Sequence, residues 1–185
     1  ASIKAAVSER DLIEGIKRSG SVATQAGVSL DELVGVISAV QERTARGGAV
    51  IGNSFKTIFT RIQSIDKLKT MQNLGVQITN ASGDILSGTQ LIQNLGKAIE
   101  TLPDAKKLQI AENLVGKFQI APFLAILEDY NSETSKAIEI TKVAQGAFSE
   151  AYDRNIALNE TLSAAINSVV VNLQDLANTL GEIGV

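Results

Sequence analysis

Apolar residues recur four and three positions apart along the last part of the chain. This spacing is the heptad pattern of a helix that buries a seam, formed by positions called a and d, against a partner. A single helix of this kind is not stable alone, so we expect the seam to form an oligomer interface. Its positions are Phe148, Tyr152, Asn155, Asn159, Leu162, Ile166, Val169, Leu173, Leu176, Leu180 and Ile183.

Two seam positions are polar, with Asn155 at d and Asn159 at a. Buried Asn layers cost stability but fix the register and the number of strands. The alternative is that the coiled coil begins only at Leu162, which would leave both Asn side chains exposed. A continuous helix over residues 133–183 would form a rod of about 75 Å.

The chain before residue 130 contains shorter amphipathic segments separated by Gly, Pro and capping residues. Ser29 followed by Glu32 predicts a capping box at one helix start. Gly48 and Gly52 lie one turn apart and would let another backbone approach closely. The predicted helices span residues 9–26, 30–45, 51–62, 65–73, 89–102 and 104–115, with a short helix after residue 122.

One stretch departs from the helical pattern. Val76 and Ile78 alternate with polar residues, and the turn-forming residues 80–83 follow. This pattern predicts a short β-hairpin or an extended excursion. The predicted fold is therefore all-α: a small multi-helix domain with one short hairpin over residues 1–130, then a long coiled-coil-type helix over residues 131–185.

Composition agrees with helices and narrows the chemistry. Aromatic residues make up 4% of the 185 residues and there are only two Pro, which argues against a sandwich or barrel. The chain has no Cys and no His, which removes disulfides, thiolate metal sites and the commonest general base. We predict no cofactor and no metal. No apolar run reaches the length of a membrane span, and the absence of an initial Met or signal peptide predicts a piece of a longer protein.

Few motifs suggest catalysis. Ser64 and Lys67 have the Ser-x-x-Lys spacing of some acyl-transfer enzymes, but Ser64 is more simply a helix N-cap. Gly96-Lys97 lacks the earlier Gly of a phosphate loop. The carboxylates that could be drawn as pairs are usually solvated helix faces. They are Glu9, Asp11 and Glu14, and Asp129 with Glu133.

Residues 23–33 also have the spacing of a DNA-binding helix-turn-helix. The second helix, however, begins with Asp31 and Glu32 and carries no Lys or Arg up to Val40. A DNA reader needs cations against phosphates, and the net charge of the chain is −3. We therefore interpret the segment as part of a helical core and predict no sequence-specific binding of nucleic acid.

The order of several motifs resembles the core domain of phage tail tape-measure proteins. The segments that carry the resemblance are 26–33 (AGVSLDEL), 52–62 (GNSFKTIFTRI), 74–78 (LGVQI), the turn at Gly83, the helix that Gly116 closes and 123–127 (FLAIL). Each motif is weak alone, and their order and spacing are what carry the resemblance across residues 11–129. Pro122 departs from the pattern, since a polar or small residue is expected there.

The resemblance implies a non-enzymatic, structural function. Tape-measure proteins are long helical chains inside the tail tube that set tube length during assembly and leave ahead of the DNA. It implies a virion location, inside the tube or at the tail tip, and the host cytoplasm during assembly. The implied partners are further copies of the chain, with a trimer favoured, the tail tube protein, baseplate hub or distal tail proteins and tail assembly chaperones. We expect no membrane contact from this segment.

Two other functions remain open from the sequence. The first is a helical adaptor or tape-measure component of a phage-tail-like contractile injection machine, which would use the same rod. The second, from another class, is an acyl-transfer enzyme built around Ser64 and Lys67.

Overall fold

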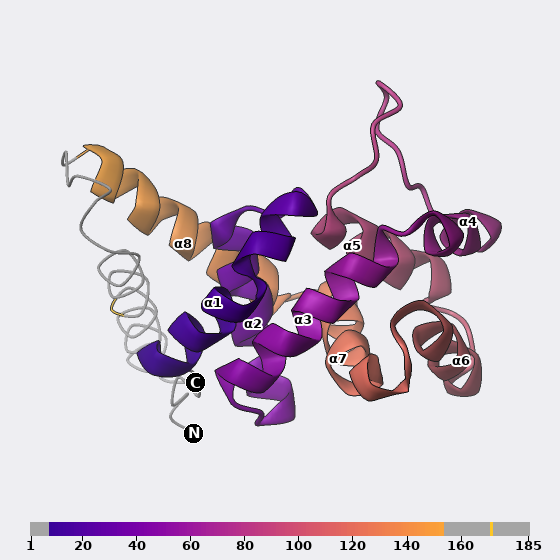
Figure 1. Cartoon of the computed structure of the whole chain (residues 1–185), viewed down its shortest axis with the longest axis horizontal. Coiled ribbons are helices and arrows are strands. Elements are labelled where there is room, and N and C mark those ends of the chain that lie inside the picture. The colour runs from indigo at the N-terminus through magenta and orange to yellow at the C-terminus, as the bar shows by residue number, and fades with distance from the viewer. Residues whose placement is uncertain (1–7, 154–170, 172–185) are drawn as a thin grey trace.

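The computed structural model describes residues 8–153 and residue 171, and within them the chain is helical (Figure 1). This confirms the all-α prediction. The elements are α1 (Glu9–Gln25), α2 (Leu30–Thr44), α3 (Gly48–Ile62), α4 (Ile65–Asn73), α5 (Gly88–Ile99), α6 (Asp104–Val115), the short 3₁₀ helix η1 (Lys117–Gln119), α7 (Ile120–Asn131) and α8 (Lys136–Asp153).

Helix α2 lies at the centre of the group of helices that also contains α1, α3 and α8. Every residue from Leu33 to Gln41 is buried, because α1, α3, α7 and α8 all pack on this helix. Its start is fixed by the predicted capping box, in which the Glu32 backbone N–H donates to Ser29 Oγ and Glu32 Oε2 accepts from the Ser29 N–H. The sequence predicted one buried stripe here, whereas a helix covered on all sides buries its whole circumference.

Helices α1 and α3 cross at a distance that only glycine permits. A Cβ on Gly48 would collide with the backbone carbonyl of Asp11, and one on Gly52 would lie 2.5 Å from the carbonyl oxygen of Gly15. The predicted close approach of another backbone at Gly48 and Gly52 is therefore confirmed.

The same crossing contains a side-chain cap. Asp11 Oδ1 accepts a hydrogen bond of 3.0 Å from the Gly48 N–H at the start of α3, and Asp11 Oδ2 accepts one of 2.8 Å from the Ser8 hydroxyl. The Gly48 N–H, and after it the Ser8 hydroxyl, lower the pKa of the Asp11 carboxyl below its usual value. Asp11 is thus an N-terminal cap supplied to α3 by α1, rather than part of a solvated carboxylate face.

We expect this cap to make stability depend on pH. A carboxyl whose pKa is lower in the folded than in the unfolded state adds stability that is complete above the unfolded pKa, about 3.9 for Asp, and is lost as the pH falls through the folded value. Asn at position 11 keeps an acceptor but has no charge to titrate. The stability difference between the parent and Asp11→Asn should be constant above about pH 5 and shrink below about pH 4. Urea unfolding across this range measures it, and a constant difference down to pH 3 would contradict the assignment.

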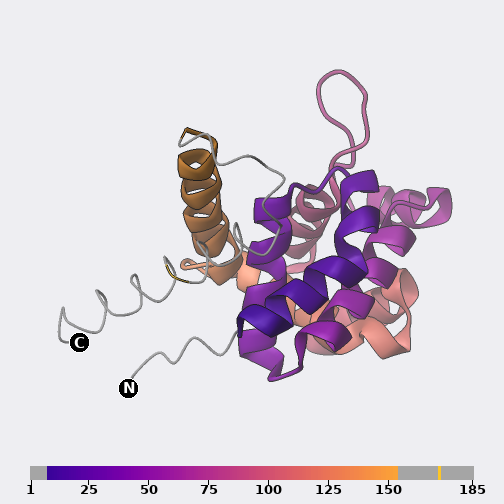
Figure 2. The same ribbon diagram turned by 60° about the vertical axis from the view of Figure 1, so that its left-hand side comes forward.

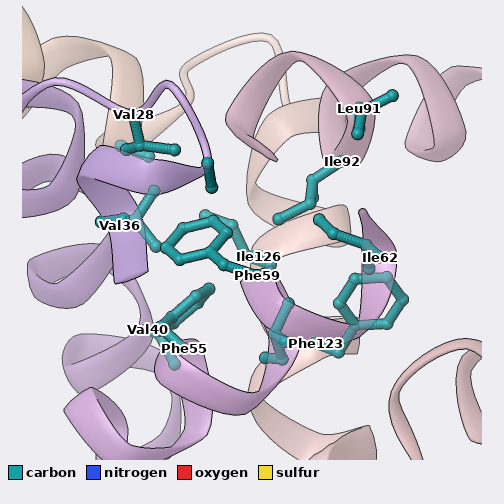
Figure 3. Close-up of a cluster of buried hydrophobic side chains, with 14 of the residues drawn as sticks. Val28, Val36, Val40, Phe55, Phe59, Ile62, Leu91, Ile92, Phe123 and Ile126 are labelled. Atoms are coloured by element: carbon teal, nitrogen blue, oxygen red, sulfur yellow. The ribbon is translucent and has the colours of Figure 1, made fainter. Parts of the chain in front are cut away.

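The largest buried side chains join α3 to α7 and its neighbours (Figure 3). Phe55 and Phe59 of α3 have ring centroids 5.5 Å apart, and the ring planes are tilted by 41°. Phe123 of α7 is fully buried in the same cluster. Tilted aromatic pairs of this kind add stability beyond the area they bury. The cluster links the α1–α2–α3 part of the molecule to α5 and α7.

The junction between α6 and α7 accommodates Pro122. Helix α7 begins at Ile120, so Pro122 lies in the first turn, where a backbone N–H has no helical partner to lose. The sequence placed the helix start at the proline itself. In the described part of the chain, no single helix is long and apolar enough to cross a membrane. One pair of helices, Asp104–Val115 with Lys117–Asn131, is together long and apolar enough, but the two are bent by 116° relative to each other.

The predicted β-hairpin is not seen, while the alternative prediction, an extended excursion, fits this segment. Within the described residues, the segment between α4 and α5 is a projecting loop that contains a single antiparallel bridge, between Thr79 and Ile85 (Figures 1 and 2). Val76 and Ile78 are buried at its base, but residues 80–85 are exposed. Alternation therefore indicated the buried residues correctly, while the exposed arms have no surface to pack on and form no strands.

Candidate functional site: the attachment of the last helix

The most connected polar group in the described part of the chain is the carboxylate of Asp129, in the last turn of α7. It is fully buried. Its Oδ2 accepts hydrogen bonds from the Ser135 hydroxyl at 2.7 Å and the Ala137 N–H at 2.9 Å, and its Oδ1 accepts from the Lys136 N–H at 3.2 Å. A carboxylate at a helix N-terminus pairs with unsatisfied N–H groups and with the helix dipole. Asp129 therefore caps the N-terminus of α8 together with Ser135, whose Oγ accepts from the Ile138 N–H at 3.3 Å.

Arginine from α2 completes this cluster. Arg43 Nε donates to Asp129 Oδ1 at 3.4 Å, and an Arg43 terminal nitrogen lies 3.7 Å from Glu128 Oε2. Nearby, Lys136 Nζ lies 3.5 Å from Glu42 Oε1. Because a buried polar group is costly without partners, these contacts and the capping bonds explain how the Asp129 side chain is tolerated in the core. The cluster ties α2, α7 and α8 together at one point.

Small residues bring α8 close to α2. A Cβ on Gly35 would collide with the carbonyl of Ala137 and the hydroxyl of Thr141. Among the α8 side chains that the structure describes, in residues 136–149, the buried ones are also small, namely Ala137, Ala144 and Ala147. The α2 and α8 axes can approach closely because neither helix has a bulky residue at these positions. Gly35 was not singled out in the sequence, although a Gly within an apolar helix is a signal of close packing.

The sequence interpretation of Asp129 was wrong, while Glu133 is exposed as predicted. Asp129 lies three residues after the buried Ile126, so the helical period places it on the side that faces the core. The partner donors come from residues six to eight positions further along and from α2. That non-local pairing is what periodicity could not reveal. The sequence divided the chain after residue 130 and predicted a helix from residue 133, whereas α8 begins at Lys136.

The predicted oligomer seam falls largely outside the residues that the structure describes. Phe148 is partly buried and packs against the core, and Tyr152 lies in the described backbone of α8. The seam therefore remains a prediction. The positions outside the described residues are Asn155, Asn159, Leu162, Ile166, Val169, Leu173, Leu176, Leu180 and Ile183.

Ser64 and Lys67 are not arranged as a nucleophile and its base. Ser64 Oγ lies 2.7 Å from both the Arg61 carbonyl oxygen and Asp66 Oδ1. Lys67 Nζ lies 3.3 Å from Asp66 Oδ2. A Ser/Lys pair requires the amine to accept the serine proton, whereas both groups here contact other acceptors. Ser64 stands at the N-cap position of α4, as predicted, although its hydroxyl bonds backward to Arg61.

The other polar candidates have structural contacts. Glu14 forms an ion pair of 3.6 Å with Arg18 on the surface of α1. Gly96 packs against the side chain of Asn131, whose amide donates to the Gly96 carbonyl at 2.9 Å. Among the described residues, no group of three or more acidic side chains could hold a metal ion.

The helix-turn-helix segment is part of the core. The helix that would enter a DNA groove is α2, and its middle, from Leu33 to Gln41, is buried under α1, α3, α7 and α8. A recognition helix must expose side chains to base edges. This geometry agrees with the interpretation of residues 23–33 as core.

Comparison with known proteins identifies the family. Residues 1–116 match the family model described as phage-related minor tail protein. The chain is also 25% identical over 172 residues to a tape measure protein from Pneumococcus phage Dp-1, an alignment that covers 90% of this chain and 15% of that protein. No solved structure matches.

These matches confirm the resemblance to phage tail tape-measure proteins that the motif order indicated. The relative is much longer than this chain, which spans only 15% of its length. The family match over residues 1–116 covers more than half of the 185 residues, and the chain therefore belongs to the family of phage-related minor tail proteins.

Proposed function

We propose that this chain is a segment of a tape-measure protein that contributes to setting tail tube length during assembly and leaves the tail ahead of the DNA. The observation that carries this proposal is the match to a tape measure protein over 90% of the chain. The all-helical core supports it, because a helix converts the number of residues into length at about 1.5 Å per residue. The role is structural rather than enzymatic, and the contacts of Ser64 and Lys67 agree with that.

We further propose a two-part organisation. Residues 1–130 form a helical core, and residues 131–185 continue from it as a helix that self-associates through the predicted seam. The first half of α8 packs on α2 and is capped by Asp129, which supports a fixed direction for the chain that follows. In this arrangement the core would anchor the extension to its neighbours: further copies of the chain, the tube protein, baseplate or distal tail proteins and, before packaging into the virion, assembly chaperones.

A deletion in phase with the heptad tests the ruler function. Removing residues 162–175 from the parent protein in a phage takes out two heptads and keeps the seam in register. If this segment lies along the tube, the tail should shorten by about 20 Å, to the nearest tube ring. Electron microscopy of purified particles measures the length. Tails of unchanged length with impaired assembly would contradict the ruler function and assign the segment to a docked end of the tail.

The matched control removes two residues, 162–163, and shifts the seam out of phase. A heptad seam tolerates a change of seven residues but not of two, because the apolar face rotates away from its partner. We expect this variant to assemble poorly wherever the segment lies. Normal assembly of this variant would show that the seam is not used, and the self-association proposal would fail.

A further inference from the structure

The connection between α7 and α8 contains no residue type that excludes a continuous helix. Residues 132–135 contain neither Gly nor Pro, whereas the turns after α1, α2, α4, α5 and α6 all contain one or the other. Gly and Pro are the residues that end helices through their own backbone preferences. The bend between α7 and α8 is therefore not imposed by Gly or Pro. Serine hydroxyls contribute to it instead, since Ser132 Oγ accepts from the Thr134 N–H and Ser135 Oγ accepts from the Ile138 N–H.

Two kinds of contact hold the bend and the helix that follows it. Asp129 caps α8 through the Ser135 hydroxyl and two backbone N–H groups, which also belong to the bend itself. The remaining α8 contacts are with α2: the close approach of Gly35 to Ala137 and the ion pair between Glu42 and Lys136. These α2 contacts join groups that are far apart in the sequence, so they are the same whether α8 comes from the same chain or from another.

The groove on α2 is shaped for this helix and for few others. Gly35 leaves room for a backbone carbonyl directly above it, and a helix with a large residue at position 137 or 144 would not seat there, since both Ala side chains are at most 1% exposed. Glu42 at the edge of the groove faces Lys136 of α8. Shape and charge both select α8, and the occupant that carries an identical α8 is a second copy of this chain.

We propose that α7 and α8 can straighten into one helix and that α8 then docks on the α2 groove of a second copy, exchanging identical helices between two chains. Exchange of this type restores the α2–α8 contacts of the closed form. It gives up the Asp129 cap, because the Lys136 and Ala137 N–H groups would bond to carbonyls within the continuous helix. It uses residues 35–42 and 136–147 and does not depend on the heptad seam or on the ruler function. It assigns the α2 face as an interface between copies during assembly.

A pair of single-cysteine chains tests the exchange, because the natural sequence contains no Cys. Full-length Glu42→Cys and Lys136→Cys chains are unfolded, mixed, refolded at high concentration and treated with a short bismaleimide. The two wild-type side chains form a 3.5 Å ion pair, so the linker can join them only where α8 is docked on α2. Exchange predicts a covalent dimer in the mixture. A chain with both substitutions, at low concentration, is the control for docking within one chain.

Glu133→Pro and Glu133→Ala separate exchange from other forms of association. Glu133 is exposed, its N–H donates to no group among the described residues, and Ser132 before it has ψ 142°, a value that a residue preceding Pro prefers. Proline should therefore fit the bend but disrupt a continuous helix, and we expect it to reduce the interchain product at least about tenfold. Glu133→Ala should retain the product.

Two results would overturn the proposal. One is the absence of interchain product in the mixture when the double-cysteine chain reacts within itself. The other is an equal yield of interchain product with Glu133→Pro, because that variant leaves residues 148–183 unchanged and association through the heptad seam would survive it. The first result would exclude exchange, and the second would assign the association to contacts that do not require the continuous helix.

Discussion

Gly48→Ala is expected to lower the free energy of unfolding by about 3 kcal/mol or more. The added methyl group would collide with the main-chain carbonyl of Asp11, and a backbone cannot turn aside as a side chain can. Relieving the collision requires α1 and α3 to move apart, which disrupts the Asp11 cap and loosens the apolar contacts along the crossing. Urea unfolding followed by circular dichroism measures the change.

Gly20→Ala is the matched control, since it makes the same substitution within α1. The nearest atom to a Cβ at that position is a methyl carbon of Ile16 at 3.8 Å, an ordinary contact. Alanine should therefore stabilise the helix by about 0.5–1 kcal/mol through its better helix propensity. Similar effects of the two substitutions would show that the α1–α3 crossing is not as close as described.

Asp129→Asn is expected to lower the free energy of unfolding by about 2–3 kcal/mol. Asparagine keeps one acceptor oxygen and replaces the other by an amide that cannot accept from the Ser135 hydroxyl and the Ala137 N–H. A buried N–H without an acceptor costs free energy, and Arg43 loses its anionic partner. The loss should be concentrated in α8, so amide hydrogen exchange should accelerate there before it does in α3.

Glu128→Gln is the control for this substitution. The Glu128 side chain is 72% exposed and lies 3.7 Å from the same arginine, so its ion pair should contribute less than about 0.5 kcal/mol. Uniform acceleration of exchange over all helices in Asp129→Asn, or a loss no greater than that of Glu128→Gln, would contradict the role of Asp129 as the attachment point of α8.

Much of this fold follows from local rules that a sequence displays directly. The capping box at Ser29, the glycine that ends α6 and the apolar period of α3 depend on residues three or four positions apart. Helix starts were accordingly predicted to within a few residues, and the last helix, predicted from residue 133, begins at Lys136. The close approach at Gly48 was also predictable, because two glycines one turn apart on an apolar helix leave room for another backbone to pack closely.

The absence of strands between α4 and α5 and the exact start of α8 were not predictable in the same way. Alternation at Val76 and Ile78 indicates which side chains are buried, but strands form only where a second edge or layer is available. The residues of the bend would suit a helix, so the pattern favoured a continuous rod from residue 133. The end of α7 is set instead by Asp129 and its donors.

The sequence by itself determined that the chain is helical, where most helices begin, and which family its motifs resemble, because caps, periodicity and motif order are properties of neighbouring residues. Only the tertiary structure decided that α2 lies buried on all sides, that Asp129 is a buried cap and that α8 rests on Gly35. Those features join residues as far apart as Arg43 and Asp129, 86 positions along the chain. Their energies depend on which helices meet, and a pattern within one helix does not specify its neighbour.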